Sequence, residues 1–399
     1  MPLSNWHWLT VAGGTFESDT DGTFHCDIPG TFQSAVDGTF DSATDGTFQS
    51  DMGGTFGPLL SQGLSAMLMD AIQQDKELAA CIVSSDEQKK RMLRMLGVSV
   101  QMERQYIMYE EAVQRLSAFA TECGLQMVIL KGYGLSLNYP VPAHRPCGDI
   151  DVYVLSSDLS SCGHLLLDEA VKRKKGINVD VSSRHHSRFA FMGFMVENHL
   201  TVMDPDSHKE YIELNKLLSE EIGKGMREVN GVLLPSFRFY SIHQLAHMAG
   251  DFASTGTNLR RLLDWATFVD SAQAAGGVDW DFVYATADMV GMLPFLNAIN
   301  DICVRYLGYD KDLFPVRCEI EKIQSFIQLS DRVFADLIAC HEPVLYPSQT
   351  NIFRYAWVKG RQFMRNRWKY EMVYKENAWK AMFRKGCNSL FMALNRINQ

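Results

Sequence analysis

Alternating apolar and polar positions predict a small sheet in the middle of the chain. The segments 126–130, 149–155, 186–192 and 194–203 are short and mostly apolar, which is typical of strands. Successive side chains on a strand point to opposite faces. Ile150 and its alternate neighbours therefore enter a core, while the polar positions between them share the other face.

Helical spacing of apolar residues dominates on both sides of these strands. Apolar positions recur every three or four residues over 65–97 and again over 99–124, which predicts two or more helices, the last one ended by a glycine. One apolar stripe of this region faces the sheet and consists of Met102, Tyr106, Tyr109, Val113, Leu116 and Ala120. A further helix is predicted to begin at Asp158 and end near Lys175.

The pattern as a whole predicts an α+β fold. A small mixed sheet flanked by helices lies between N-terminal helices and a C-terminal helical region, where Asn258 to Asp270 is an amphipathic helix. The expected segments are an acidic repeat tail, N-terminal helices, a catalytic core, a helical domain and basic-aromatic helices, at residues 1–66, 67–124, 125–235, 236–345 and 346–399.

The first 66 residues form an acidic repeat. Thr-Phe pairs begin at residues 15, 23, 31, 39, 47 and 55, and the segment has eight acidic residues and no Lys or Arg. Low hydrophobicity with charge of one sign favours disorder, with a small repeat structure and calcium binding through the aspartates as alternatives. So regular a repeat is also typical of a translated DNA repeat, in which case the working protein starts near Met67.

Composition excludes few classes of protein. The chain is 46% hydrophobic and 21% charged, with a net charge of −9 that the repeat almost accounts for. These values are ordinary for a soluble globular protein, and no apolar run approaches the length of a membrane span. The nine cysteines form no CxxC pair, so we expect reduced thiols in the cytoplasm.

Two aspartates one residue apart are the leading candidates for chemistry. Asp149 and Asp151 share one face of a predicted strand, where like charges repel unless a cation lies between them. Mg²⁺ prefers such oxygen ligands and commonly arrives with substrate phosphates. Gly132 and Gly134 flank the start of a short helix-compatible segment, whose free backbone N–H groups suit an anion. An isolated Asp-x-Asp, however, is more often a pair of surface aspartates.

The order of these motifs resembles a known family. Leu130-Lys131-Gly132, Tyr139-Pro140, Arg145 and Asp149-Ile150-Asp151 follow one another as in the bacterial family of uncharacterised nucleotidyltransferases, within the polymerase-β-like nucleotidyltransferase superfamily. The likeness spans about Gln114 to Val269. One departure is Gly132-Tyr133, where the wider superfamily places Gly-Ser or Gly-Gly.

This resemblance implies a metal site and a nucleotide site. Asp149 and Asp151 would hold two Mg²⁺ ions, and Glu197, within Glu197-Asn198-His199, would be the third carboxylate. An NTP such as ATP would bind through Lys131, Gly132, Gly134 and Arg145. Asp180 and Asp204 are rivals for the third carboxylate, and a zinc site of His185, His186 and His199 is a further alternative.

Two features later in the chain remain open. His243 and His247 lie one helical turn apart without the Glu of a zinc-protease motif, so they are expected to line the core or the substrate. Residues 354–385 hold ten Lys or Arg against two Glu, with aromatic residues between them. Such a segment either docks its aromatic side on the protein or binds nucleic acid or an anionic membrane.

The expected activity is Mg²⁺-dependent transfer of a nucleoside monophosphate from an NTP to an unknown hydroxyl-bearing acceptor, with release of pyrophosphate. The acceptor is either a small molecule or a macromolecule. The alternative is a catalytically silent or regulatory binding protein of the same fold, such as half of a toxin–antitoxin pair. A phosphatase or nuclease fits less well, since it has no need for the phosphate-binding turn.

Overall fold

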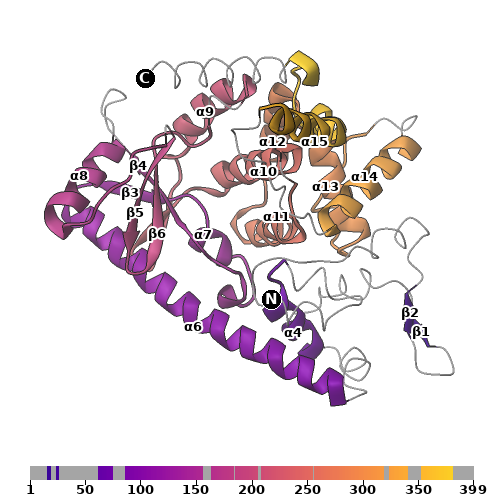
Figure 1. The fold of residues 1–399 in the computed structure, drawn as a ribbon, viewed down its shortest axis with the longest axis horizontal. Coiled ribbons are helices and arrows are strands. Elements are labelled where there is room, and N and C mark those ends of the chain that lie inside the picture. The colour runs from indigo at the N-terminus through magenta and orange to yellow at the C-terminus, as the bar shows by residue number, and fades with distance from the viewer. Residues whose placement is uncertain are drawn as a thin grey trace.

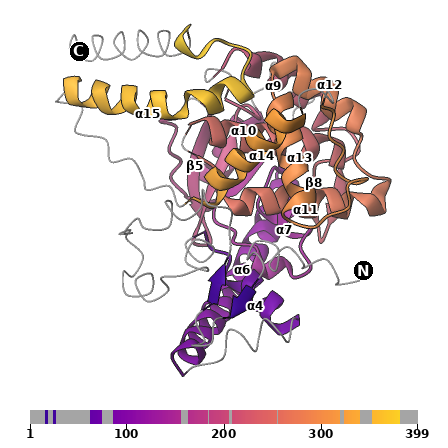
Figure 2. The ribbon, with the colours of Figure 1, turned by 90° about the vertical axis from the view of Figure 1, so that its right-hand side faces the viewer.

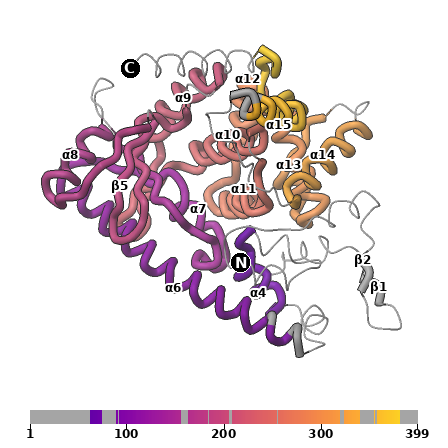
Figure 3. The backbone as a smooth tube through the Cα atoms, viewed as in Figure 1, coloured from indigo at the N-terminus to yellow at the C-terminus, as the bar shows by residue number. Residues whose placement is uncertain are grey.

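The computed structural model describes ten segments of the chain, drawn in colour in Figure 1, which are residues 16–18, 24–26, 62–74, 86–155, 163–183, 185–204, 208–254, 256–318, 323–339 and 352–380. Figure 3 traces the path of the backbone through the sheet and the helices. In the repeat, strands β1 (Phe16–Ser18) and β2 (Phe24–Cys26) pair antiparallel. The remaining residues before 62, and Asp158 with the predicted start of its helix, lie outside the described residues. The predictions made for them stay predictions.

A mixed six-stranded sheet forms the middle of the molecule. Its strands stand in the order β5-β6-β4-β3-β8-β7, with β4 parallel to β6 and β3 parallel to β8. Their bounds are Gln126–Ile129 for β3, Ile150–Leu155 for β4, His186–Phe191 for β5, Phe194–His199 for β6, Arg227–Val229 for β7 and Val232–Leu234 for β8.

The four strands expected from the sequence are present; three agree with the predicted bounds to within one residue, and β6 is clearly shorter. β6 ends at His199, where we expected it to reach residue 203. The reason is pairing: His199 is the last residue of β6 with partners in both β4 and β5. Leu200 still donates its N–H to the carbonyl of His185 at 2.8 Å, but neither β4 nor β5 pairs with residues 201–203.

One face of the sheet packs on helices α6 (Asp86–Glu122) and α8 (Gly163–Lys175), which Figure 1 shows along its lower left side. The predicted stripe is buried in this core, except for the half-exposed Met102. It meets Ile150, Val152 and Val154 of β4, as the alternation predicts. Gly124, at φ +74°, follows the end of α6.

The predicted break near Gly97 is wrong, because α6 runs without interruption through 37 residues. A single glycine inside a helix costs only about 1 kcal/mol, less than the packing of so long a helix provides. Ser99, where the second helix was expected to begin, donates its hydroxyl to the carbonyl of Met95 at 3.0 Å. Its side chain thus finds a hydrogen-bond partner inside the helix.

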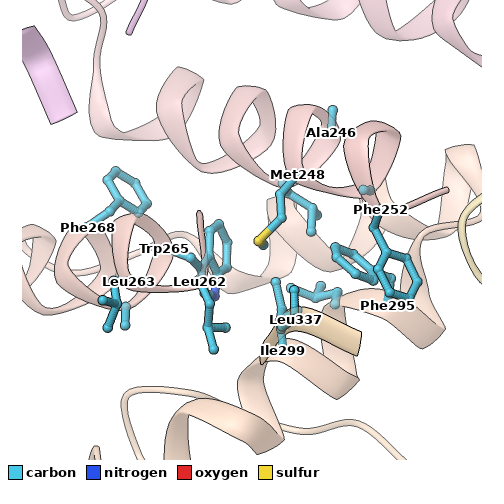
Figure 4. Packing of buried hydrophobic residues seen from close by; sticks show 14 of the residues in the cluster. Ala246, Met248, Phe252, Leu262, Leu263, Trp265, Phe268, Phe295, Ile299 and Leu337 are labelled. Atoms are coloured by element: carbon cyan, nitrogen blue, oxygen red, sulfur yellow. The ribbon is translucent and has the colours of Figure 1, made fainter. Parts of the chain in front are cut away.

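The other helices form a second core. They are α4 (Ser65–Gln74), α9 (Glu210–Glu221), α10 (Phe237–Ser254), α11 (Leu259–Ala272), α12 (Trp280–Val290), α13 (Leu293–Arg305), α14 (Ile323–Ile338) and α15 (Ile352–Val373). Figure 4 shows Met248 and Phe252 of α10 directed toward neighbouring helices, with the Phe252 and Phe295 ring centroids 4.9 Å apart. This core includes Leu130 and Tyr139. It therefore extends to the end of β3, close to the acidic motif at the start of β4.

Two short helical turns complete the connection between β3 and β4. They are α7 (Tyr133–Ser136) and a 3-10 turn at Pro142–His144. In Figure 1, α7 lies between the sheet and α11. Among the described residues, every helix is too short or too polar to cross a membrane.

Candidate active site

The acidic side chains meet because two parallel strands set them side by side. Asp151 of β4 stands opposite Glu197 of β6, and Tyr153 opposite His199. All four therefore belong to the same sheet face. His199 Nε2 lies 3.0 Å from Asp151 Oδ1, and ligand atoms of Asp151, Glu197 and His199 all lie within 4.8 Å of one another. The sheet brings the predicted third carboxylate to the second aspartate of the motif.

Asp149 lies just before β4 and is exposed. It does not belong to the group of Asp151, Glu197 and His199, whose ligand atoms lie within 4.8 Å of one another. The negative charges of this group nevertheless act on it. The pKa of Asp149 is raised above its usual value, first by partial burial and then by the negative charges of Glu197 and Asp151. A cation placed among the three carboxylates would relieve this repulsion.

Two cationic side chains neutralise the acidic group in the structure. Lys131 Nζ lies 3.0 Å from Asp151 Oδ1, and Arg188 of β5 donates to Glu197 Oε1 from Nε at 3.0 Å and from Nη2 at 2.6 Å. Burial alone would raise the pKa of Asp151, yet the His199 hydrogen bond and the Lys131 charge hold it well below its usual value. Asp151 is therefore ionised at neutral pH.

The glycine turn lies directly against the aspartate strand. Gly132 has φ +70° and ψ −98°, a conformation that side chains disfavour. A Cβ on Gly132 would lie 2.3 Å from Tyr109 Oη and 3.6 Å from the Asp149 carbonyl oxygen. The hydroxyl of Tyr109 also donates to that carbonyl at 3.2 Å. Tyr109 thus braces both the turn and the start of β4.

Tyr133, at the position where the superfamily that the motif resembles has serine or glycine, points away from the acidic group. Tyr133 is buried in the core beneath the sheet, and its hydroxyl donates to Glu110 at 2.9 Å and accepts from Asn230 at 3.2 Å. The turn therefore offers an anion its backbone groups and no side chain of residue 133, and its two glycines are themselves buried, with Gly134 packed against the hydroxyl of Tyr240.

Substitution of Gly132 by alanine is expected to destabilise the protein by about 2 kcal/mol or more, since it combines backbone strain with overpacking. Adding Tyr109→Phe removes the atom that the new Cβ would overlap, so the double variant should regain part of the loss. Urea unfolding measures both effects. An alanine variant as stable as the wild type would contradict the described turn.

Arg145 lies in a buried ion pair. Its Nε and Nη2 donate to Asp264 of α11 at 2.7 and 2.9 Å, and Tyr139 donates to the same carboxylate at 2.7 Å. Arg145 Nη1 reaches the carbonyl of Gly132 at 3.4 Å. These contacts connect the glycine turn to the helical part, and none of them is with the acidic group. No motif or spacing in the sequence indicates Asp264, 119 positions away, as a partner of Arg145.

The two helical histidines lie behind Lys131. Lys131 Nζ lies 3.2 Å from His247 Nε2, whose Nδ1 lies 3.3 Å from Asp251, which pairs in turn with Arg261 at 3.4 Å. His243 is buried, and burial first, then the charges of His247 and Lys131, hold its pKa well below the usual value. A chain of polar contacts therefore leads from Asp151 to α11.

Of the alternative ligands of the sequence analysis, His199 belongs to the acidic group itself, and the others have different partners. His185 pairs with Asp204 at 3.1 Å, and Asp180 forms a backbone bridge with Arg188. His186 Nε2 is 3.8 Å from Glu197. Among the described residues, neither Asp180 nor Asp204 belongs to a group of three close metal-type ligands.

A second group of such ligands was not foreseen. His208, Glu210 and Glu376 have ligand atoms within 4.8 Å of one another, and the backbone N–H of Glu376 donates to Glu210 at 2.9 Å. The two glutamates are 166 positions apart in sequence, so spacing alone carries no signal of their meeting.

The C-terminal basic-aromatic segment is divided in two. Tyr370 and Tyr374 of α15 and the turn after it are buried in the helical core. Trp357, near the start of α15, is 63% exposed. Figure 2 shows α15 reaching past the other helices. The docking interpretation holds for the C-terminal half, and binding of nucleic acid or a membrane by the N-terminal half stays a prediction.

The fold and the site together indicate a protein that acts on phosphate esters. A mixed sheet whose parallel strands place carboxylates beside a glycine turn is an arrangement suited to phosphate esters. The family model described as uncharacterised nucleotidyltransferase matches residues 61–308, more than half of the chain, and the chain belongs to this family. The match extends beyond the expected 114–269 at both ends. No curated protein and no solved structure matches the chain.

Proposed function

We propose that this member of the family transfers a nucleoside monophosphate from an NTP to a hydroxyl-bearing acceptor, in a Mg²⁺-dependent reaction that releases pyrophosphate, on a core of the polymerase-β-like type. The single observation that carries the proposal is the pairing of Asp151 with Glu197 on one sheet face, with Asp149 at the strand's start and the Gly132 turn against it.

The residues of the site fit the expected metal. Three carboxylates offer the oxygen ligands that Mg²⁺ prefers. The pKa of Asp149 is raised first by its partial burial and then by repulsion from Glu197 and Asp151. We propose that Asp149, Asp151 and Glu197 hold two Mg²⁺ ions. Bound Mg²⁺ would neutralise the triphosphate and lower the pKa of the acceptor hydroxyl.

The side chains would act on the two ends of the reaction. The acceptor oxygen forms a bond to the α-phosphorus, the bond between that phosphorus and the bridging oxygen breaks, and pyrophosphate leaves. Glu197 is placed to accept the hydroxyl proton, since Arg188 bonds only to its Oε1 while Oε2 lies 3.9 Å from His199. Lys131 would neutralise charge on the leaving group, and the backbone of the Gly132–Gly134 turn would hold phosphate oxygens.

Arg145 takes a different part in this proposal from the one the resemblance implied. Because its guanidinium is buried against Asp264, we propose that it positions the glycine turn through the carbonyl of Gly132. Contact with the phosphates would then fall to Lys131 and to backbone N–H groups of the turn.

Calorimetry with an NTP tests the proposal. We expect binding with Mg²⁺ and at least about tenfold weaker binding after chelation, since the carboxylates then repel the triphosphate. Pyrophosphate release should accompany turnover once an acceptor from a cell extract is supplied. Binding without any turnover would favour the silent, regulatory alternative, and release of inorganic phosphate alone would favour a phosphatase.

A further inference from the structure

A small cavity lies behind Lys131, between α7, α10 and α11. Its apolar walls are Leu135, Met248 and Trp265, and its polar lining includes Lys131, His243, Gln244, His247 and Arg261. The volume is about 10 Å³, on the order of the space that one water molecule needs. The cavity therefore admits one terminal group of a ligand, not a whole ligand.

Gln244 is the feature that the fold itself does not explain. The residue is 8% exposed, and neither its amide oxygen nor its amide nitrogen has a hydrogen-bond partner among the residues that the structure describes. Burying an unpaired amide costs about 1–3 kcal/mol for each unsatisfied group. A polar side chain kept at that cost on the wall of a cavity indicates a partner from outside the chain.

The charges around the cavity indicate the chemistry of that partner. Lys131 and Arg261 contribute two cations to the cavity lining. The carboxylate in that lining, Asp264, accepts hydrogen bonds from Arg145 and Tyr139. Asp251, which touches His247 and Arg261 from α10, and Asp151, 3.0 Å from Lys131, balance this charge in the structure, so an incoming oxyanion would share the two cations with these carboxylates. Hydrogen-bond donors outnumber acceptors on the polar lining, which suits an anionic oxygen.

We propose that this cavity binds a carboxylate or phosphoryl oxygen of a substrate, held by Gln244, Lys131 and Arg261. Lys131 lies 3.0 Å from Asp151 and also lines the cavity, so the bound group would sit one side chain away from the acidic group. Its assignment to a substrate rests on the proposed function. The oxyanion belongs either to the NTP or to the acceptor.

The test is thermal unfolding of the whole chain with rising inorganic phosphate, and separately acetate, in a chelator and at constant ionic strength balanced with chloride. A ligand that binds only the folded state raises stability with its concentration. We expect the melting temperature to rise with either anion beyond the effect of chloride. A wild-type protein that responds to neither anion overturns the proposal.

Variants then locate the effect. Gln244→Glu places a like charge in the same shape and should weaken anion binding at least about tenfold. Gln244→Leu should weaken binding without loss of stability, because the amide it removes has no partner in the described part of the chain. Arg261→Met should weaken binding, while Arg260→Met, its neighbour outside the cavity lining, should not. Full anion response in Gln244→Glu and Arg261→Met would contradict the assignment.

Two further measurements distinguish the NTP from the acceptor as the source of the oxyanion. They also distinguish failure of this proposal from failure of the proposed function. With a non-cleavable α,β-methylene ATP analogue and Mg²⁺ bound, a persisting phosphate effect assigns the cavity to the acceptor. Loss of that effect, with weaker analogue binding by Gln244→Glu, assigns it to the triphosphate. Because the phosphate measurement needs neither metal nor turnover, it should also hold in Asp151→Asn. A failed transferase assay would thus leave this result standing.

Discussion

Asp151→Asn is expected to lower nucleotide transfer by at least about 10²-fold while the protein stays folded. The substitution removes the charge that faces Glu197 across the parallel strands. Asparagine keeps an Oδ1 acceptor at the position that Lys131 and His199 contact at 3.0 Å, so the local packing is retained. Transfer is measured from labelled NTP, and folding by circular dichroism.

Matched controls make this result specific. Glu210→Gln removes a carboxylate from the second group, which has the same types of ligand and lies on α9. Asp180→Asn removes the exposed rival. Both variants should keep transfer and calorimetric Mg²⁺ binding near wild-type values. Normal turnover by Asp151→Asn, or its loss in Glu210→Gln, would disprove the assigned centre.

Breaking the buried pair of Arg145 and Asp264 should cause the largest loss of stability. Removing one partner of a buried ion pair leaves the other charge uncompensated, at a cost of about 3–5 kcal/mol. Both side chains are nearly inaccessible, at 7% and 3% exposed. Arg145→Met and Asp264→Asn should each lower the free energy of unfolding by this amount in urea.

The double variant Arg145→Met/Asp264→Asn should lose less than the sum of the single changes, because no isolated charge remains and asparagine still accepts from Tyr139. The exposed pair of Arg115 and Glu111 provides the contrast, since its loss should cost less than about 1 kcal/mol. An Arg145→Met variant of full stability but poor NTP affinity would instead support the phosphate contact implied by the resemblance.

Sequence periodicity was sufficient for the elements that bury one face. The alternation in 149–155 placed Ile150 and Asp151 on opposite faces, and the structure agrees. The stripe on α6 was recognised for the same reason, since a core imposes its spacing on every residue that enters it. Glu197 came from the family resemblance, because a single acidic residue on a strand has no periodic signal.

Contacts that depend on strand register or on helices distant in sequence could not be predicted from periodicity. Arg188 meets Glu197 only because β5 and β6 pair with these two residues opposite each other, and a shift of one residue would separate them. Asp264 lies in the predicted amphipathic helix of residues 258–270 with no pattern to mark it as a buried residue, yet it is buried against Arg145, 119 positions away. Gln244 is inconspicuous in sequence, since an unpaired amide is defined by what surrounds it.

Position-specific labelling of the nucleotide tests the central claim most directly. The purified protein, Mg²⁺ and a cell extract are incubated with NTP labelled at the α-phosphate or at the γ-phosphate, with Asp151→Asn in parallel. We predict that α-label appears on an acceptor and γ-label in pyrophosphate, only with the wild-type protein. Transfer of γ-label to the acceptor, or its release as inorganic phosphate without pyrophosphate, would contradict nucleotidyl transfer by this site.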